Sequence, residues 1–189
     1  GYYALYNNTT ATYNSAFGTY ALQANTTAND NSAFGFYSMY NNTTGAANSA
    51  FGTEALKLNT TASYNSAFGH IALFTNTTGA ENVAVGYASL NANTTGHSHA
   101  AVGAYSLYAN TTGTYNAAFG HLALRFNTTG NYNNALSPYA LYSNTTGQFS
   151  SAFGYNALGV NTTGGNNTAI GYDAGVAASP SGAITTGSN

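Results

Sequence analysis

Residues 8–35 read NTTATYNSAFGTYALQANTTANDNSAFG, a stretch that contains the same phrase twice at a spacing of 17 residues. Counted from Gly1, this spacing continues through ten full repeats without an insertion or a deletion. We number the positions of each repeat 1 to 17; position 16 is alanine in all ten repeats, from Ala16 to Ala169. Repeats of this regularity stack on one another as a solenoid or array.

The repeat predicts β-structure rather than helix. Helical arrays need about 30 or more residues for two helices and their turns, and Thr pairs, Gly and Asn are poor helix formers. Two short apolar stretches, Ala16-Phe17 and Ala21-Leu22, flank Gly18. We therefore expect an all-β parallel β-solenoid, a β-roll of 17-residue coils with two short strands per coil. At about 4.8 Å per coil, ten coils form a rod roughly 48 Å long.

The end of the sequence departs from the repeat. Residues 1–175 hold the ten full repeats and the start of an eleventh, which has Gly175 in place of the usual leucine. We expect residues 176–189 to form an inserted loop, from Val176 to Ala183, followed by the start of a further repeat at Thr185. Because the register resumes after the loop, we expect the array to continue, or its ends to meet those of other subunits in a filament.

Each expected strand carries a small residue followed by a large apolar one, and neighbours on a strand face opposite sides. Two packings are open. If the alanine columns lie inside, the Phe and Leu columns form an exposed surface far beyond the few hundred Å² found on monomers, and the rolls must associate. The alternative buries Leu and Phe inside one self-sufficient solenoid. The self-association candidates in the first packing are Leu5, Phe17, Leu22, Phe34, Met39, Phe51, Leu56 and Phe68.

The stretches NSAFG, NVAVG (Asn82 to Gly86) and NTAIG (Asn167 to Gly171) resemble the head repeats of trimeric autotransporter adhesins. The longer stretch NTAIGYDAG, which starts at Asn167, is also similar to repeats of phage tail-fibre-like proteins. The resemblance to the adhesin heads implies a left-handed parallel β-roll and three chains packed together, with apolar residues of each coil in the trimer interior. It favours the associated packing.

The low charge of the chain excludes several function classes. Only 3% of residues are charged, against about 25% in an ordinary soluble domain. Lys57 and Arg125 are the only basic residues, too few for a nucleic-acid interface or a basic membrane surface. No apolar run approaches the roughly 20 residues that span a bilayer, and without cysteine there is neither a disulfide nor a thiolate metal site. Abundant Asn, Thr and Gly favour an extracellular or cell-surface location.

The titratable residues do not predict a catalytic site. The four acidic residues, Asp30, Glu54, Glu81 and Asp173, are scattered over different repeats and positions, so no carboxylate pair is visible for acid–base chemistry. His97 and His99 form an H-x-H, but the simpler interpretation is that His99 replaces the asparagine of its column. We expect no enzyme, no metal site and no cofactor.

Position 8 is an asparagine in every full repeat and begins an Asn-Thr-Thr sequence that matches the N-glycosylation signal. A second column, at position 14, recurs without the signal in most repeats, which indicates a structural role. Asparagines stacked at about 4.8 Å also pair amide to amide without any sugar, so both interpretations of position 8 stay open. The glycosylation candidates are Asn8, Asn25, Asn42, Asn59, Asn76, Asn93, Asn110, Asn127, Asn144 and Asn161.

The pattern as a whole favours a structural extracellular fibre or filament subunit, an adhesin-like rod glycosylated at its Asn-Thr-Thr turns. Its expected partners are copies of itself, in a trimer or an end-to-end filament. One alternative is an ice-binding solenoid, in which Thr9, Thr10 and their successors order water. Another is a carbohydrate-binding segment of a tail fibre, since stacked tyrosines such as Tyr3 and Tyr20 present flat rings to sugars.

Overall fold

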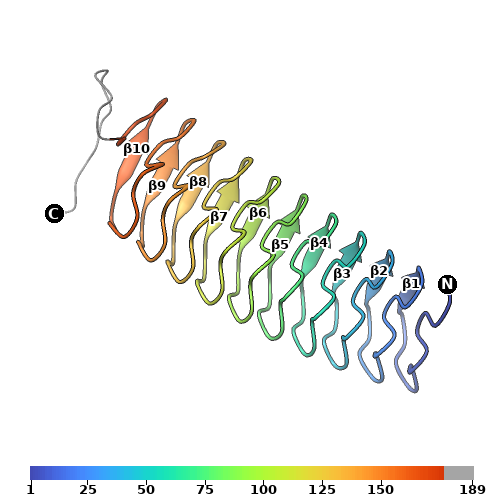
Figure 1. Ribbon diagram of the computed structural model, residues 1–189. Helices are drawn as coiled ribbons and strands as arrows, with labels where there is room; N and C mark the ends of the chain where they lie inside the picture. The colour runs from blue at the N-terminus through green and yellow to red at the C-terminus, as the bar shows by residue number, and fades with distance from the viewer. Residues whose placement is uncertain (177–189) are drawn as a thin grey trace.

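A computed structural model describes residues 1–176 and shows a parallel β-solenoid (Figure 1). One strand from each coil joins a single sheet of ten strands, which pair in sequence order. Each residue of a strand pairs with the residue at the same repeat position in the next coil, as Ala33 does with Ala50 and Phe34 with Phe51. The expected fold class is therefore confirmed. The strands are β1 (Ser15–Phe17), β2 (Ser32–Phe34), β3 (Ser49–Phe51), β4 (Ser66–Phe68), β5 (Val83–Val85), β6 (Ala100–Val102), β7 (Ala117–Phe119), β8 (Asn134–Leu136), β9 (Ser151–Phe153) and β10 (Thr168–Ile170).

Each coil contains one strand, so the expectation of two strands per coil is wrong. The segment that includes Ala21 and Leu22 is a turn, because the residues at positions 3 and 5 adopt left-handed backbone angles, with φ of 60° at Tyr20 and 52° at Leu22. Left-handed residues cannot extend a strand. The turn still bonds to the next coil, since Leu22 N donates to Ser38 O at 3.0 Å.

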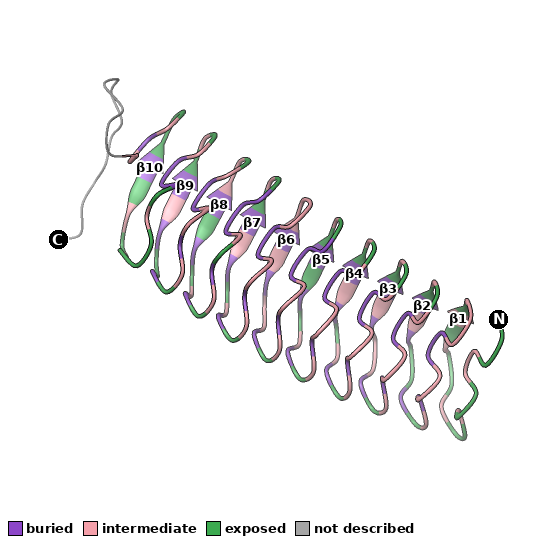
Figure 2. Cartoon of the chain, in the orientation of Figure 1, coloured by how far each residue is buried: buried purple, intermediate pink, exposed green. Residues whose placement is uncertain are grey.

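The interior of the coil is filled by the position-16 alanines together with the position-5 leucines. Ala50 and Leu56 are fully buried, whereas Phe51 is 37% exposed. In Figure 2 the middle of each strand from β2 to β10 is buried and its ends are more open, whereas the middle of β1, at the end of the rod, is of intermediate burial. Each of the two packings considered above is thus half right: alanine lies inside and Phe outside, but Leu lies inside as well.

The glycine at position 1 is required where each strand turns back. Gly52 has a φ of +141°, and a Cβ on it would lie 2.5 Å from the carbonyl oxygen of Gly69 in the next coil. Both the backbone angle and the close approach of successive coils exclude a side chain here. The one exception in the ten strand exits is Ser137, which is not among the residues with positive φ.

Residues 177–189 lie outside the described part of the chain. The inserted loop expected from Val176 to Ala183 and the further repeat expected at Thr185 fall almost entirely in this segment.

Candidate functional site

The position-8 asparagines form a buried ladder along the rod. Asn59 Nδ2 donates to Asn42 Oδ1 at 2.8 Å and to the carbonyl oxygen of Ala62 at 2.9 Å. Asn76 Nδ2 in turn donates to Asn59 Oδ1 at 2.9 Å. Both amide hydrogens of each interior side chain are therefore used, one along the rod and one within its own turn.

This ladder is incompatible with N-linked sugars on the interior members of the column in the folded coil. A glycan replaces one of the two Nδ2 hydrogens and needs an open path to solvent, and these side chains have no exposed surface. The glycosylation expectation is therefore wrong for these positions: Asn25, Asn42, Asn59, Asn76, Asn93, Asn110, Asn127 and Asn144. At the first and last coils Asn8 and Asn161 are only partly buried, and both donate to the carbonyl three residues ahead.

The position-14 asparagines form a second ladder that meets the first. Asn48 N donates to Asn31 Oδ1 at 3.0 Å, and Asn48 Nδ2 donates to Ala62 O at 2.9 Å. The carbonyl of Ala62 thus accepts from both Asn48 and Asn59. Two asparagine columns consequently fix the turn between them, which explains why both columns recur so regularly in the sequence.

His99 replaces an asparagine in the second ladder and reproduces its bonds. Its Nε2 lies 2.7 Å from the carbonyl oxygen of Gly113, and its Nδ1 accepts from Asn116 N at 3.2 Å. This arrangement requires a neutral ring protonated on Nε2. Burial lowers the pKa of His99 to about 4. Since both nitrogens are engaged, His99 has no lone pair for a metal, and the partly exposed His97 is not part of the ladder.

The two threonine columns differ in exposure. At position 9 the hydroxyl donates to the next coil, as Thr60 Oγ1 does to Thr77 O at 3.1 Å. At position 10 the threonines, such as Thr61, are exposed. Only one regular threonine rank therefore faces water, at a bend rather than on a flat strand, which weakens the geometric basis for ice binding.

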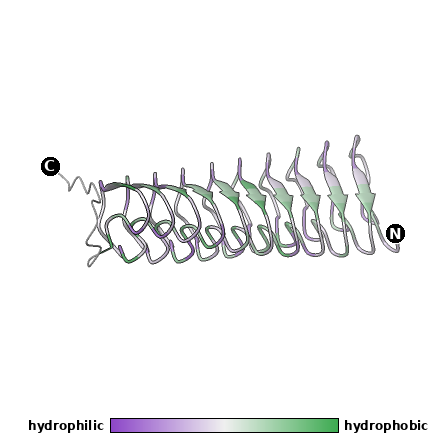
Figure 3. Cartoon of the chain, turned by 90° about the horizontal axis from the view of Figure 1, so that it is seen from above, coloured by the Kyte–Doolittle hydropathy of each residue, from purple (hydrophilic) through white to green (hydrophobic). Residues whose placement is uncertain are grey.

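The position-17 residues form a continuous apolar stripe on the outer face of the sheet. Phe34, Phe51 and Phe68 stack with ring centroids 4.7 and 5.0 Å apart and planes 5° from parallel. In Figure 3 apolar residues recur along the row of strands. We call this the phenylalanine stripe, and its members are Phe17, Phe34, Phe51, Phe68, Val85, Val102, Phe119, Leu136, Phe153 and Ile170.

The self-association candidates divide between the stripe and the core. Phe17, Phe34, Phe51 and Phe68 are exposed by 37% or more. By contrast Leu22, Met39 and Leu56 have no exposed surface, and Leu5 of the first coil is partly buried. The leucine column cannot contact a second chain, so its assignment as an association surface is wrong.

The tyrosines pack mainly against one another. Tyr20 and Tyr37 stack at 4.9 Å between ring centroids, and Tyr115, Tyr132 and Phe149 form a second stack at 5.0 and 5.2 Å. Such aromatic ladders support the surface of the coils.

The acidic residues lie in different coils, and those with a side-chain partner each have a different one. Glu54 pairs with Lys57 at 2.6 Å, and Asp173 accepts from Asn156 at 2.8 Å. Across residues 1–176, no group of three or more His, Asp and Glu side chains is placed to hold a metal ion. The arrangement therefore offers surfaces and ladders rather than a set of converging reactive groups.

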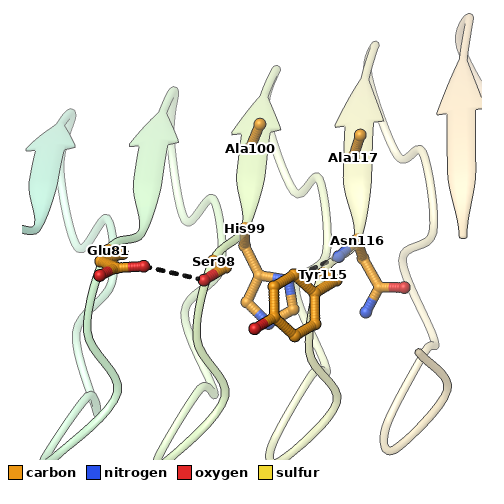
Figure 4. Close-up of a pocket in the computed structure, with 7 residues that line it drawn as sticks. All are labelled: Glu81, Ser98, His99, Ala100, Tyr115, Asn116 and Ala117. Atoms are coloured by element: carbon orange, nitrogen blue, oxygen red, sulfur yellow. Dashed lines mark hydrogen bonds between the residues drawn. The ribbon is translucent and has the colours of Figure 1, made fainter. Parts of the chain in front are cut away.

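A hollow of about 340 Å³ beside Glu81 and Tyr115 is a feature that the sequence interpretation missed (Figure 4). Position 13 is aromatic in half of the coils but is Ser98 here, between Glu81 and Tyr115 of the neighbouring coils. The sequence feature that could have indicated the hollow is therefore a small residue, Ser98, in a column that is often aromatic. It indicates a hollow only when the coils are known to stack.

In the described part of the chain, no helix has the length and apolar character needed to cross a membrane. Comparison with protein-family models, curated proteins and solved structures finds no match to this chain.

Proposed function

We propose that this chain is a structural rod, a subunit of an extracellular fibre or filament, which associates side by side with copies of itself through the phenylalanine stripe. The observation that carries the proposal is the stripe itself. Position 17 is apolar in all ten coils, and most of its side chains are exposed by more than a third.

The size of the stripe supports association. Ten coils at about 4.8 Å give a stripe over 40 Å long, with the small position-15 side chains beside it. The exposed apolar area of a stripe this long exceeds the few hundred Å² found on monomers. Such an area suits an interface of about 800 Å² per partner. Because two copies have the same coil spacing, their side chains come into register all along the contact.

The charge of the chain is compatible with close packing of copies. The chain has two basic and four acidic residues, so copies placed side by side repel one another little. The resemblance to adhesin heads gives three as the expected number of chains. Catalysis has no part in this proposal, because the supporting features are a uniform surface and a rigid coil.

Sedimentation velocity on the full chain tests the proposal. We expect wild type to sediment as an oligomer and the double variant Phe51→Asp, Phe119→Asp to sediment as a monomer, because buried unpaired carboxylates oppose association. The matched control is Thr61→Asp, Thr129→Asp, which adds the same charge to the exposed threonine column. Circular dichroism checks that all three proteins keep the same fold. A monomeric wild type at high concentration would contradict the proposal.

A further inference from the structure

The hollow beside Glu81 and Tyr115 is built by three neighbouring coils. Ala100 of β6 and Ala117 of β7 form its apolar part, and Glu81 and Tyr115 stand on either side of Ser98. Glu81 Oε2 accepts from Ser98 Oγ at 3.1 Å. Within residues 1–176 Glu81 takes part in no ion pair. The hollow therefore presents one uncompensated carboxylate beside an aromatic ring and an apolar floor.

The ring of Tyr115 is supported but not covered. It stacks on Tyr132 at 5.0 Å and meets the ring of His97 at 5.1 Å in a perpendicular arrangement. Nevertheless 47% of Tyr115 is exposed. The two aromatic partners, one stacked and one perpendicular, hold the ring in place, and its remaining surface is available to a ligand in the hollow.

The same chain shows an ammonium group held between a carboxylate and an aromatic ring, there with the carboxylate and the ring in adjacent coils rather than two coils apart. Lys57 Nζ lies 2.6 Å from Glu54 Oε1 and 5.0 Å from the centre of the Tyr37 ring. Arg125 likewise lies 5.4 Å from the centre of the Tyr105 ring. Both fixed cations of the chain are thus placed over aromatic rings, and one of them completes a carboxylate–ammonium–aromatic set.

We infer that the hollow at Glu81 and Tyr115 is a binding site for an organic cation, an alkylammonium group that lies over Ser98 and makes the same two kinds of contact that Lys57 makes with Glu54 and Tyr37. The ammonium group donates to the Glu81 carboxylate and contacts the Tyr115 ring through a cation–π interaction. Its alkyl chain lies on Ala100 and Ala117. The hollow, of about 340 Å³, is open to solvent on one side, so a small cation enters it without any movement of the coils.

The chemistry of the hollow favours a cation over a neutral sugar. A sugar needs several convergent donors and acceptors to fix its hydroxyl groups. Besides the Glu81 carboxylate and the Tyr115 hydroxyl, the polar side chains that line the hollow already have partners: Ser98 donates to Glu81, the ring of His99 is bonded within the ladder, and Asn116 donates to Gly130 O. Besides Glu81, the titratable groups that line the hollow are His99 and Tyr115, and His97 contacts both Ser98 and Tyr115. The ring nitrogens of His99 are both bonded within the ladder. The hollow thus carries a net negative charge when these rings are neutral.

Titration of the full chain with n-butylammonium chloride, followed by NMR at pH 8 and low salt, tests the inference. We expect saturable shifts centred on Tyr115 and Ala117, with a dissociation constant on the order of 10 mM, as suits one exposed cation–π contact and one exposed ion pair. The neutral analogue n-butanol should bind at least threefold more weakly, and methyl glucoside should not bind. A lysine-containing tripeptide tests whether the same ammonium chemistry is accepted from a peptide side chain.

Two variants locate the site. Glu81→Gln removes the charge and should weaken butylammonium binding about threefold or more. Ser98→Tyr fills the hollow with a ring and should abolish binding; it is expected to fold, because Tyr64 and Tyr115 occupy the same position with the same left-handed backbone. Glu54→Gln is the matched control, since it removes a carboxylate already paired with Lys57, and it should leave binding unchanged.

Several outcomes would overturn the inference: no saturable shift up to 200 mM butylammonium (roughly twentyfold above the expected constant), equal binding of butanol, stronger binding of the glucoside, or undiminished binding by Ser98→Tyr. Failure of this inference and failure of the rod proposal are distinguishable, because cation binding is read by NMR titration and association by sedimentation. No residue of the phenylalanine stripe lines the hollow, although Ala100 and Ala117 lie beside the stripe.

Discussion

Asn59 and Asn42 are joined by a 2.8 Å hydrogen bond between side-chain amides that belong to successive coils and are both fully buried. The same bond recurs from coil to coil, so the polar column is a continuous part of the interior and not a series of surface sites. Each member satisfies a donor or an acceptor of both its neighbours, which makes the stability of one coil dependent on the next.

Replacing one member of this ladder should destabilise the rod. Asn59→Ala leaves Asn42 Oδ1 without its donor, Asn76 Nδ2 without one acceptor and Ala62 O with one donor fewer. We expect the free energy of unfolding to fall by about 2–4 kcal/mol, measured by denaturant titration. The control Thr61→Ala, in the exposed part of the same turn, should change it by less than about 0.5 kcal/mol. Equal effects of the two substitutions would show that the amide ladder is not stabilising.

His99 should make the stability of the rod depend on pH. Its pKa is lowered by burial from 6.5 to about 4, so the unfolded chain binds a proton at a higher pH than the folded chain does. Stability should therefore be unaffected by His99 above pH 6.5, fall as the pH drops from 6.5 to about 4, and level off below that. The total loss corresponds to about 3 kcal/mol.

The variant His99→Asn isolates this contribution. It restores the asparagine found at the same position in neighbouring coils such as those of Asn82 and Asn116. The variant and wild type keep all other titratable groups in common, so the difference between their stability curves reports His99 alone. Above neutral pH the difference in free energy of unfolding between the two proteins should be constant. Parallel curves between pH 4 and 6.5 would contradict the prediction.

Alanine substitutions at Leu56 and Phe51 should distinguish the stability contribution of the core from that of the outer stripe. Leu56 has no exposed surface, and Phe51 is 37% exposed. We expect Leu56→Ala to lower the free energy of unfolding by about 2–5 kcal/mol through loss of burial and a cavity. Phe51→Ala should cost about 1 kcal/mol or less in the monomer but should weaken association in sedimentation. A large loss of monomer stability at Phe51 would place that residue in the core instead.

Ala47→Gly should stabilise the protein, against the usual sign of such a substitution. Ala47 has a φ of 56°, a left-handed conformation that costs an L-residue roughly 1–2 kcal/mol and glycine almost nothing. After the entropic cost of glycine, we expect a gain of about 0.5–1 kcal/mol in thermal or denaturant unfolding. Its neighbour Ala46, whose φ is not positive, provides the control: Ala46→Gly should destabilise by about 0.5–1 kcal/mol.

Peptide mapping should find no sugar on the buried asparagines when the protein is expressed in a secreting, glycosylating host. Asn42, Asn59 and Asn76 need both amide hydrogens for the ladder. A chain that acquired sugars there before folding could not close its coils. Substantial occupancy at these three positions in soluble, folded protein would contradict the observed packing.

The sequence alone predicts much of the fold because the repeat constrains it so strongly. An uninterrupted spacing of 17 residues means that every coil must meet its neighbour with the same residues in register, as Ala33 meets Ala50. The β-structure, the coil length and the parallel register follow from that spacing. Whether the invariant alanine at position 16 lies inside or outside was left open by the sequence, and the burial of Ala50 and Ala67 places it inside.

The orientation of the leucine column was decided only by the tertiary structure. Alternation of inward and outward side chains assumes an extended backbone, and the left-handed angles at Tyr20 and Leu22 break that assumption. Leucine and tyrosine seldom adopt such angles by themselves, so no local preference indicates them. Burial of leucine and the backbone bonds to both neighbouring coils hold the turn in this conformation.

The roles of the asparagines and of the hollow also depend on contacts between coils. A sequon and a rung of an amide ladder are identical as sequence, and only the closeness of Asn42 to Asn59 distinguishes them. Glu81 and Tyr115 are 34 residues apart in the chain, since two repeats separate them, and they face a common hollow because stacking brings their coils together. The sequence determined the repeating unit and its register; the stacking of that unit decided which side chains are buried, which are exposed and which act together, because those properties belong to neighbouring coils and not to any one of them.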